Sequence, residues 1–171
     1  MSDQLSSHAF HPSTDPTQFK KALSRYTTGV AVVTAATPAG PIGITANSFT
    51  SISLSPALVM WAPAKTSMRH DEFVAANAFA IHILSSGQKD ICDGFVRSKS
   101  AFDTVPFTLN EDGVPIISNS LAVFECKQYQ THDAGDHTII LGEVHTGYEQ
   151  AGDSLVFTNG TFVSLPAKAT L

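Results

Sequence analysis

The chain has 171 residues, which suits one folded domain with a sizeable core. Of these residues, 43% are hydrophobic and only 15% are charged, so we expect much of the surface to be buried, for example in contact with a second subunit. The net charge of −5, without any basic block, disfavours a nucleic-acid partner. Because there is neither a membrane-span-length apolar run nor a secretory pattern, and the two cysteines have no metal-binding spacing, we expect a cytoplasmic protein with reduced thiols and no membrane partner.

The N-terminal part predicts a tail, a helix and a strand. Residues 1–14 are polar and are expected to form a loose tail, while residues 15–171 form one domain. Asp15 followed by Pro16 is typical of a helix start, with Asp as the N-cap. Apolar residues at helical spacing extend the predicted helix to Tyr26, and the β-branched run 30–36 predicts a buried strand.

The most informative stretch is residues 42–55, IGITANSFTSISLS, which begins like a strand and then becomes polar. Buried polar groups must be hydrogen-bonded, and each unpaired one costs about 1–3 kcal/mol. Residues 42–63 also contain no charged side chain. The pattern leaves two interpretations open: a solvated surface connection, or a loop that binds a flat, neutral ligand rich in carbonyl and ring-nitrogen groups.

The remainder of the chain is mainly β. We expect strands at 57–62 and 78–84, and helices at 67–76, capped by Ser67, and at 86–96. Residues 101–119 contain three turn signals and only short apolar runs.

The last third predicts paired strands. A loop at 131–137 separates strands at 121–130 and 138–146, and Asn159-Gly160 between two apolar runs is a strong hairpin signal. Seven or more strands with antiparallel neighbours and few helices predict a mainly β fold, a closed barrel with helices added.

Several side chains are candidates for a site. His132, Asp133, Asp136 and His137 crowd one loop, but their spacing matches no common zinc pattern, so we expect no metal and either a hydrated turn or His137 facing a ligand. Basic residues could meet a phosphate or be solvated surface charges: Lys65, Arg69, Arg97 and Lys99. Aromatic residues could stack on a flat ring or belong to the core: Trp61, Phe95, Phe102 and Phe162.

Two sets of motifs, in order, carry a resemblance to a known family. The first set is TGVAVVT at 28–34 and GITANSFTSISLSP at 43–56; the second is AGDHT at 134–138, LGEV at 141–144, and LVF to GTF at 155–162. The chain resembles the short flavin reductases of the FMN-binding split-barrel superfamily, which include the reductase components of two-component flavin monooxygenases.

The resemblance implies a homodimer of split β-barrels, antiparallel and Greek-key-like with a few added helices, that binds FMN or FAD near the subunit interface. It implies that Thr45, Ala46, Asn47 and Ser48 line the isoalloxazine and that His137 lies at the nicotinamide side. Other residues implied to contact the cofactor, several toward its phosphate, are Ser51, Ser53, Ala62, Lys65, Ser67, Arg97 and Phe162.

The implied function is transfer of hydride from NADH or NADPH to the flavin, which then leaves for a partner monooxygenase. The chemistry belongs to the cofactor, so neither an acid–base pair nor a covalent nucleophile is needed. Two alternatives stay open: a non-catalytic flavin- or haem-binding split-barrel module, and a reductase of a small organic substrate that keeps flavin as a fixed group.

Overall fold

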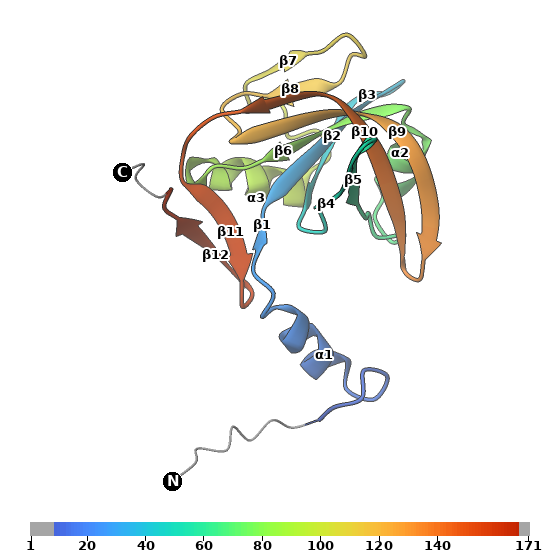
Figure 1. The fold of residues 1–171 in the computed structure, drawn as a ribbon, viewed down its shortest axis with the longest axis vertical. Coiled ribbons are helices and arrows are strands. Elements are labelled where there is room, and N and C mark those ends of the chain that lie inside the picture. Colours follow the sequence, from blue (N-terminus) through green and yellow to red (C-terminus); the bar gives the residue numbers. More distant parts are fainter. Residues whose placement is uncertain (1–8, 168–171) are drawn as a thin grey trace.

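The computed structural model describes residues 9–167, so residues 1–8 of the predicted tail and residues 168–171 of the predicted domain lie outside the described residues. The described chain forms three antiparallel sheets with helices added around them (Figure 1). None of its helices is long and apolar enough to cross a membrane.

Helix α1 (Pro16–Leu23) begins as predicted, because the Asp15 carboxylate accepts a hydrogen bond from the Gln18 N–H at 2.9 Å. The helix ends at Leu23, three residues before the predicted end at Tyr26. It projects away from the barrel and buries none of its residues (Figure 1). The apolar face that its sequence predicts is therefore exposed in the described chain.

The main sheet has seven strands in the order β3-β2-β6-β9-β10-β5-β4, and each pair of neighbours is antiparallel. The strands are β2 (Ala31–Thr37), β3 (Gly40–Ala46), β4 (Thr50–Leu54), β5 (Ala57–Trp61), β6 (Ala78–Ile83), β9 (Ala122–Ala134) and β10 (His137–Glu149). Strands β3 and β4 are joined by three residues yet stand at opposite edges of the hydrogen-bonded order. The sheet is therefore a barrel that is split between β3 and β4, which confirms the split barrel implied by the family resemblance and refines the closed barrel expected from the strand pattern alone.

Two smaller sheets complete the β structure. One has the order β1-β11-β12, built from β1 (Thr28–Gly29), β11 (Ser154–Thr158) and β12 (Thr161–Leu165). Its Asn159-Gly160 turn confirms the predicted hairpin, and both turn residues have positive φ, at 49° and 79°. The other sheet pairs β7 (Phe107–Leu109) with β8 (Pro115–Ile117).

The middle helices differ from the prediction at their N-termini. Helix α2 (His70–Ala75) begins three residues after Ser67, which does not cap it. The preceding residues instead form turns, in which the Ser67 N–H donates to Ala64 O at 2.9 Å. The predicted helix at 86–96 is a 3₁₀ turn, η1 (Ser86–Gln88), followed by α3 (Lys89–Arg97), because Ser85 and Gln88 form a capping box.

The predicted loop at 131–137 is also corrected, because β9 continues to Ala134 and β10 already begins at His137. The turn between them needs only Gly135 and Asp136, and the φ of +68° at Gly135 is one that glycine adopts without strain. Polar residues here do not indicate a loop, since this end of the hairpin extends past the core with both faces polar. The hairpin consequently carries His137 at a defined position.

Two hydrophobic clusters hold the barrel together. One includes Trp61, Phe73 and Phe79, with Trp61 meeting the Phe73 ring edge-on at 5.0 Å between centroids. The other packs Phe95 of α3 against the sheet, where a Cβ at Gly43 would lie 2.4 Å from the Phe95 ring. Glycine at position 43 therefore permits α3 to approach β3 closely.

Candidate active site

The polar segment after β3 forms a loop of residues 47–49 that crosses to β4, and its anchors are two hydroxyl groups. The Thr45 hydroxyl donates to Cys92 O at 2.7 Å. The Ser48 hydroxyl accepts from the Ala62 N–H at 2.9 Å and donates to Ala62 O at 3.2 Å. These hydroxyls thus hold the loop to α3 and to the end of β5.

The main-chain N–H donors of the same loop have no hydrogen-bond partner in the described part of the chain. Among residues 9–167, the amide N–H groups of residues 47–49 have no hydrogen-bond acceptor, and the Asn47 side chain is exposed. Main-chain N–H groups are strong donors that require partners when a ligand covers them. The loop therefore offers backbone amides, more than hydroxyls, to a ligand.

A cavity of about 220 Å³ lies beside this loop and contains most of the predicted site residues. Three chain segments line it: residues 44–48, residues 61–64 with Ser67, and His137. The structure thus brings together Thr45, Ala46, Asn47, Ser48, Ala62, Ser67 and His137. No lining residue is an acid, a lysine or an arginine, so the cavity suits an uncharged polar ring.

Trp61 adds a donor that the sequence does not reveal. Its side chain is fully buried and it lines the cavity, yet its indole Nε1–H has no hydrogen-bond partner in the described part of the chain. Buried indole N–H groups usually find a partner. The free amides of residues 47 and 48 border the cavity as well, and they fit a ligand rich in carbonyl and ring-nitrogen acceptors such as a flavin ring.

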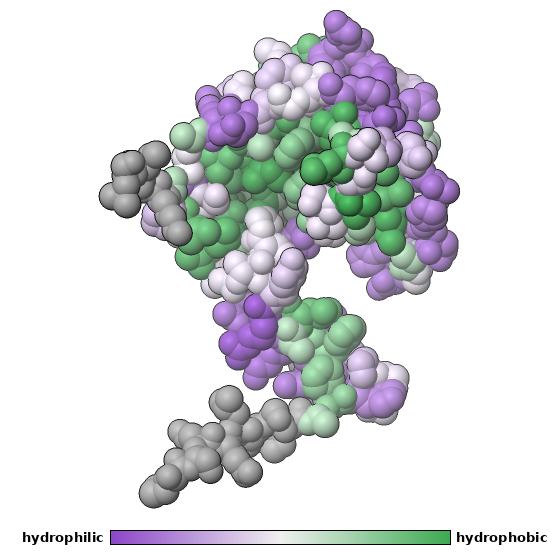
Figure 2. Space-filling view, in the orientation of Figure 1, coloured by the Kyte–Doolittle hydropathy of each residue, from purple (hydrophilic) through white to green (hydrophobic). Residues whose placement is uncertain are grey.

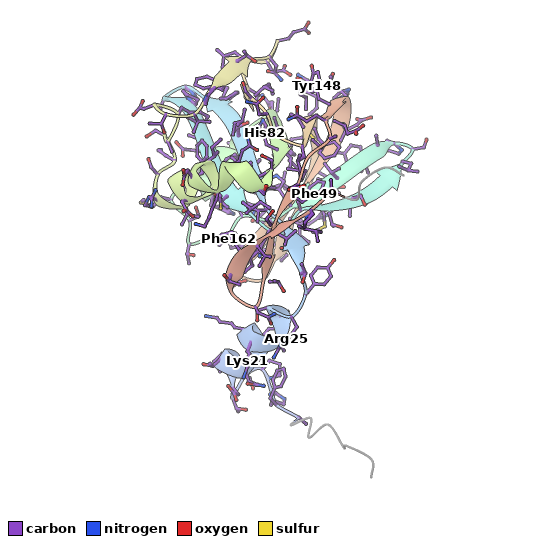
Figure 3. All side chains as sticks on the ribbon, turned by 90° about the vertical axis from the view of Figure 1, so that its left-hand side faces the viewer. Lys21, Arg25, Phe49, His82, Tyr148 and Phe162 are labelled. Carbon is purple, nitrogen blue, oxygen red and sulfur yellow. The ribbon has the colours of Figure 1, made fainter. Side chains whose placement is uncertain are left out.

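Two further hollows meet at the same loop. One, of about 150 Å³, is lined by Phe162 and Phe157, whose ring centroids are 5.1 Å apart, and by Val30 and residues 45–47. The other, of about 650 Å³, lies between α1 and residues 47–50. Phe162 lies toward the α1 end of the barrel, away from Tyr148 (Figure 3). Asn47 borders all three spaces and is their common point.

His137 is oriented by its neighbour in the turn. Its Nδ1 lies 2.7 Å from Asp136 Oδ1, and the hydrogen bond and charge of His137 lower the pKa of that carboxyl group. With Nδ1–H donating to Asp136, Nε2 is the ring nitrogen left for a ligand. The His137 side chain is 43% exposed, so the site is reachable from solvent.

The remaining candidates do not line the cavity. Lys65 directs its ammonium to Asp133 Oδ2 at 2.5 Å and to Gly135 O at 2.7 Å. Arg97 is exposed at the end of α3, while Ser51 and Ser53 lie on β4. The cofactor contacts expected for these four residues stay predictions.

Two other basic candidates already have partners within the subunit. The Arg69 guanidinium donates to Phe95 O at 2.5 Å, and burial lowers its pKa. Lys99 pairs with Glu72 at 2.8 Å. Both side chains therefore link α2 to α3 and its C-terminal segment.

Sequence reasoning missed His70 and Lys89. His70 Nε2 lies 2.8 Å from the Thr138 hydroxyl, which connects α2 to β10 next to His137. Lys89 lies over the Phe162 ring at 5.1 Å from its centroid. No spacing rule marks either contact, because each joins elements far apart in the chain.

A split antiparallel barrel with an uncharged polar cavity, next to a hollow lined by aromatic rings, defines a protein that binds a flat heteroaromatic ring. Comparison with family models finds a match over residues 23–166 to the flavin reductase like domain. The chain belongs to this family, which confirms the membership predicted from its motifs.

Individual relatives and a solved structure agree with this family membership. The chain is 51% identical over 156 residues to the FMN reductase (NADH) SmoA of Agrobacterium fabrum, covering 91% of this chain and 90% of that one. It is 32% identical to HsaB of Mycobacterium tuberculosis, the reductase subunit of a flavin-dependent monooxygenase, over 91% and 86% of the two chains. The NADH:FAD oxidoreductase SgcE6 of Streptomyces globisporus, solved with NAD and FAD fragments, superposes with a TM-score of 0.88 at 36% identity, over 96% and 100% of the chains.

Proposed function

We propose that the protein is an NAD(P)H-dependent flavin reductase that reduces FMN or FAD and supplies the reduced flavin to a partner monooxygenase. The observation that carries the proposal is the cavity at residues 44–48, which joins free main-chain donors, a buried indole N–H and His137 without any charged side chain. The relatives' names agree with it, since SmoA is an NADH-dependent FMN reductase and HsaB a monooxygenase reductase subunit.

The chain's own residues contribute binding and electrostatics. A bound flavin supplies the hydride-accepting ring, and the nicotinamide cofactor supplies the hydride. The amide N–H groups of residues 47 and 48 stabilise negative charge that develops on a ring in the cavity, because they are already held in place by the Ser48 and Thr45 hydroxyls. In this proposal His137, which lines the same cavity, orients the nicotinamide, and Phe162 borders the adjoining hollow.

A homodimer is part of the proposal. Helix α1 buries no residue in its own subunit, and Leu23 and Tyr26 are 57% and 78% exposed. Figure 2 shows apolar residues on α1 and across the adjoining face of the barrel. Exposed apolar surface of this kind marks interaction sites, and the hollow between α1 and residues 47–50 borders the candidate site.

The test is NADH and NADPH oxidation by the purified protein, with FMN, FAD and riboflavin compared side by side. We expect oxidation only when flavin is added, and we expect the flavin to be consumed as a substrate. Size-exclusion chromatography with light scattering measures the dimer. A yellow preparation that binds flavin tightly but does not oxidise either nicotinamide cofactor would reject the reductase and favour a binding module.

A further inference from the structure

The turn at residues 62–67 lines the cavity on one side, and the start of β10 with His137 lines it on another. Backbone hydrogen bonds join these two walls. The Lys65 N–H donates to Asp136 O at 2.9 Å, and the Thr138 N–H donates to Pro63 O at 3.1 Å. Ala64 and His137 form an isolated antiparallel bridge between them.

The Lys65 side chain adds a second connection across the same junction. Its ammonium lies 2.5 Å from Asp133 Oδ2 and 2.7 Å from Gly135 O, so one cation contacts both the end of β9 and the turn itself. The hydrogen bond and charge of Lys65 lower the pKa of Asp133. Charge-assisted hydrogen bonds are stronger than neutral ones, and the carbonyl contact adds geometric specificity.

Apart from the β9–β10 ladder and these backbone bonds, the turn has no packing contacts with the core among the described residues. Residues 131–137 include no buried residue, and β9 and β10 extend here beyond the core. The position of His137 therefore depends on the β9–β10 ladder and on contacts with the 62–67 turn more than on hydrophobic packing. A small displacement of a group that orients a reactant reduces the rate strongly.

We propose that Lys65 and Asp133 form a clamp that positions His137 against the cavity, which makes both of them positioning residues for hydride transfer. This inference rests on the proposed function. It gives Lys65 a role distinct from the phosphate contact expected from the sequence, because its ammonium is already bound by two acceptors of the turn.

The experiment compares Lys65→Met, Asp133→Ala and the charge-swapped double variant Lys65→Asp with Asp133→Lys. The matched control is Lys127→Met with Asp112→Ala, an exposed ion pair that joins β9 to the segment before β8 and borders none of the site cavities. Each variant is assayed with NADH against FMN and against riboflavin. Amide hydrogen exchange at Lys65 and Thr138 is followed by NMR in the same proteins.

We expect each single clamp variant to raise the KM for NADH about fivefold, the scale of one exposed charged contact, with the ratio of FMN to riboflavin activity unchanged. Exchange at both amides should accelerate. The charge swap re-forms the ion pair but not the bond to Gly135 O, because a carboxylate cannot donate, so it should restore protection and KM only in part. The control pair should change neither.

Two results would overturn the clamp. If Lys65→Met loses activity with FMN but not with riboflavin while Asp133→Ala does not, Lys65 is a phosphate ligand. If exchange at Lys65 and Thr138 matches wild type in both single variants, the side chains do not hold the turn. The exchange measurement does not require turnover, so absence of flavin-dependent NADH oxidation in the wild type would reject the proposed function separately.

Discussion

The buried residue His82 should make the folded protein less stable as the pH is lowered, and the structure allows the size of this effect to be estimated. His82 lies on β6 and is fully buried (Figure 3). Its Nδ1–H donates to Val32 O at 3.0 Å, and its Nε2 accepts from the Ile117 N–H at 3.1 Å. The bond from Ile117 requires the neutral imidazole, because the imidazolium has no lone pair to accept an N–H, whereas the bond to Val32 O is possible in either protonation state.

Burial lowers the pKa of His82 from 6.5 to about 4. At 1.36 kcal/mol per pKa unit, this corresponds to about 3 kcal/mol of stability. Below pH 6.5 the unfolded chain binds a proton at His82 that the folded protein does not bind until about pH 4. Stability therefore falls as the pH is lowered through this range, and it is fully present above pH 6.5.

The assay is urea unfolding at several pH values between 7.5 and 4.5, for wild type and for His82→Gln. The variant should be less stable than wild type at pH 7.5, but its stability should depend less on pH, and the difference in slope isolates His82 from the other titrating groups. His145→Gln, a change at an exposed residue of β10, is the control and should keep the wild-type slope. Equal slopes for wild type and His82→Gln would refute the reasoning.

Three other changes test the site and its support. His137→Ala should lower flavin-dependent NADH oxidation at least tenfold without changing the unfolding midpoint, and an unchanged rate would remove His137 from the site. Ser48→Ala removes both bonds to Ala62 and should cost about 1–2 kcal/mol in chemical denaturation while weakening flavin binding in fluorescence titration. Gly43→Ala should destabilise by about 1–3 kcal/mol, since its Cβ meets Phe95; a variant as stable as wild type would contradict this close approach.

Local structure could be predicted from the sequence wherever it is determined by residues that are close together in the chain. Asp15-Pro16 sets the start of α1 through a carboxylate and a fixed φ, and Asn159-Gly160 sets a hairpin through its positive φ values. The loop after β3 was recognisable because Asn47 and Ser48 have no place in an apolar strand. In each of these cases the determining interactions lie within a few residues.

The remainder depends on contacts between distant segments. Whether Ser67 caps a helix depends on the backbone pairing of residues 63–65 with the β10 end, which the 67–76 sequence does not contain. The Thr45 and Ser48 hydroxyls bind the backbone of Cys92 and Ala62, partners that only the folded barrel determines. For the same reason, the ammonium of Lys65 could be placed near the site but not assigned a partner.

The split between β3 and β4 has a consequence for chain connectivity. Residues 47–49 are the covalent link between the two edges of the seven-stranded sheet, and they are also the centre of the candidate site. A circular permutant with new termini in this link would disconnect β3 from β4 and would also disrupt the amide donors of the candidate site. New termini at Asn159-Gly160 would leave the link intact. Comparing the two permutants should therefore show whether the barrel can fold without a covalent connection between β3 and β4.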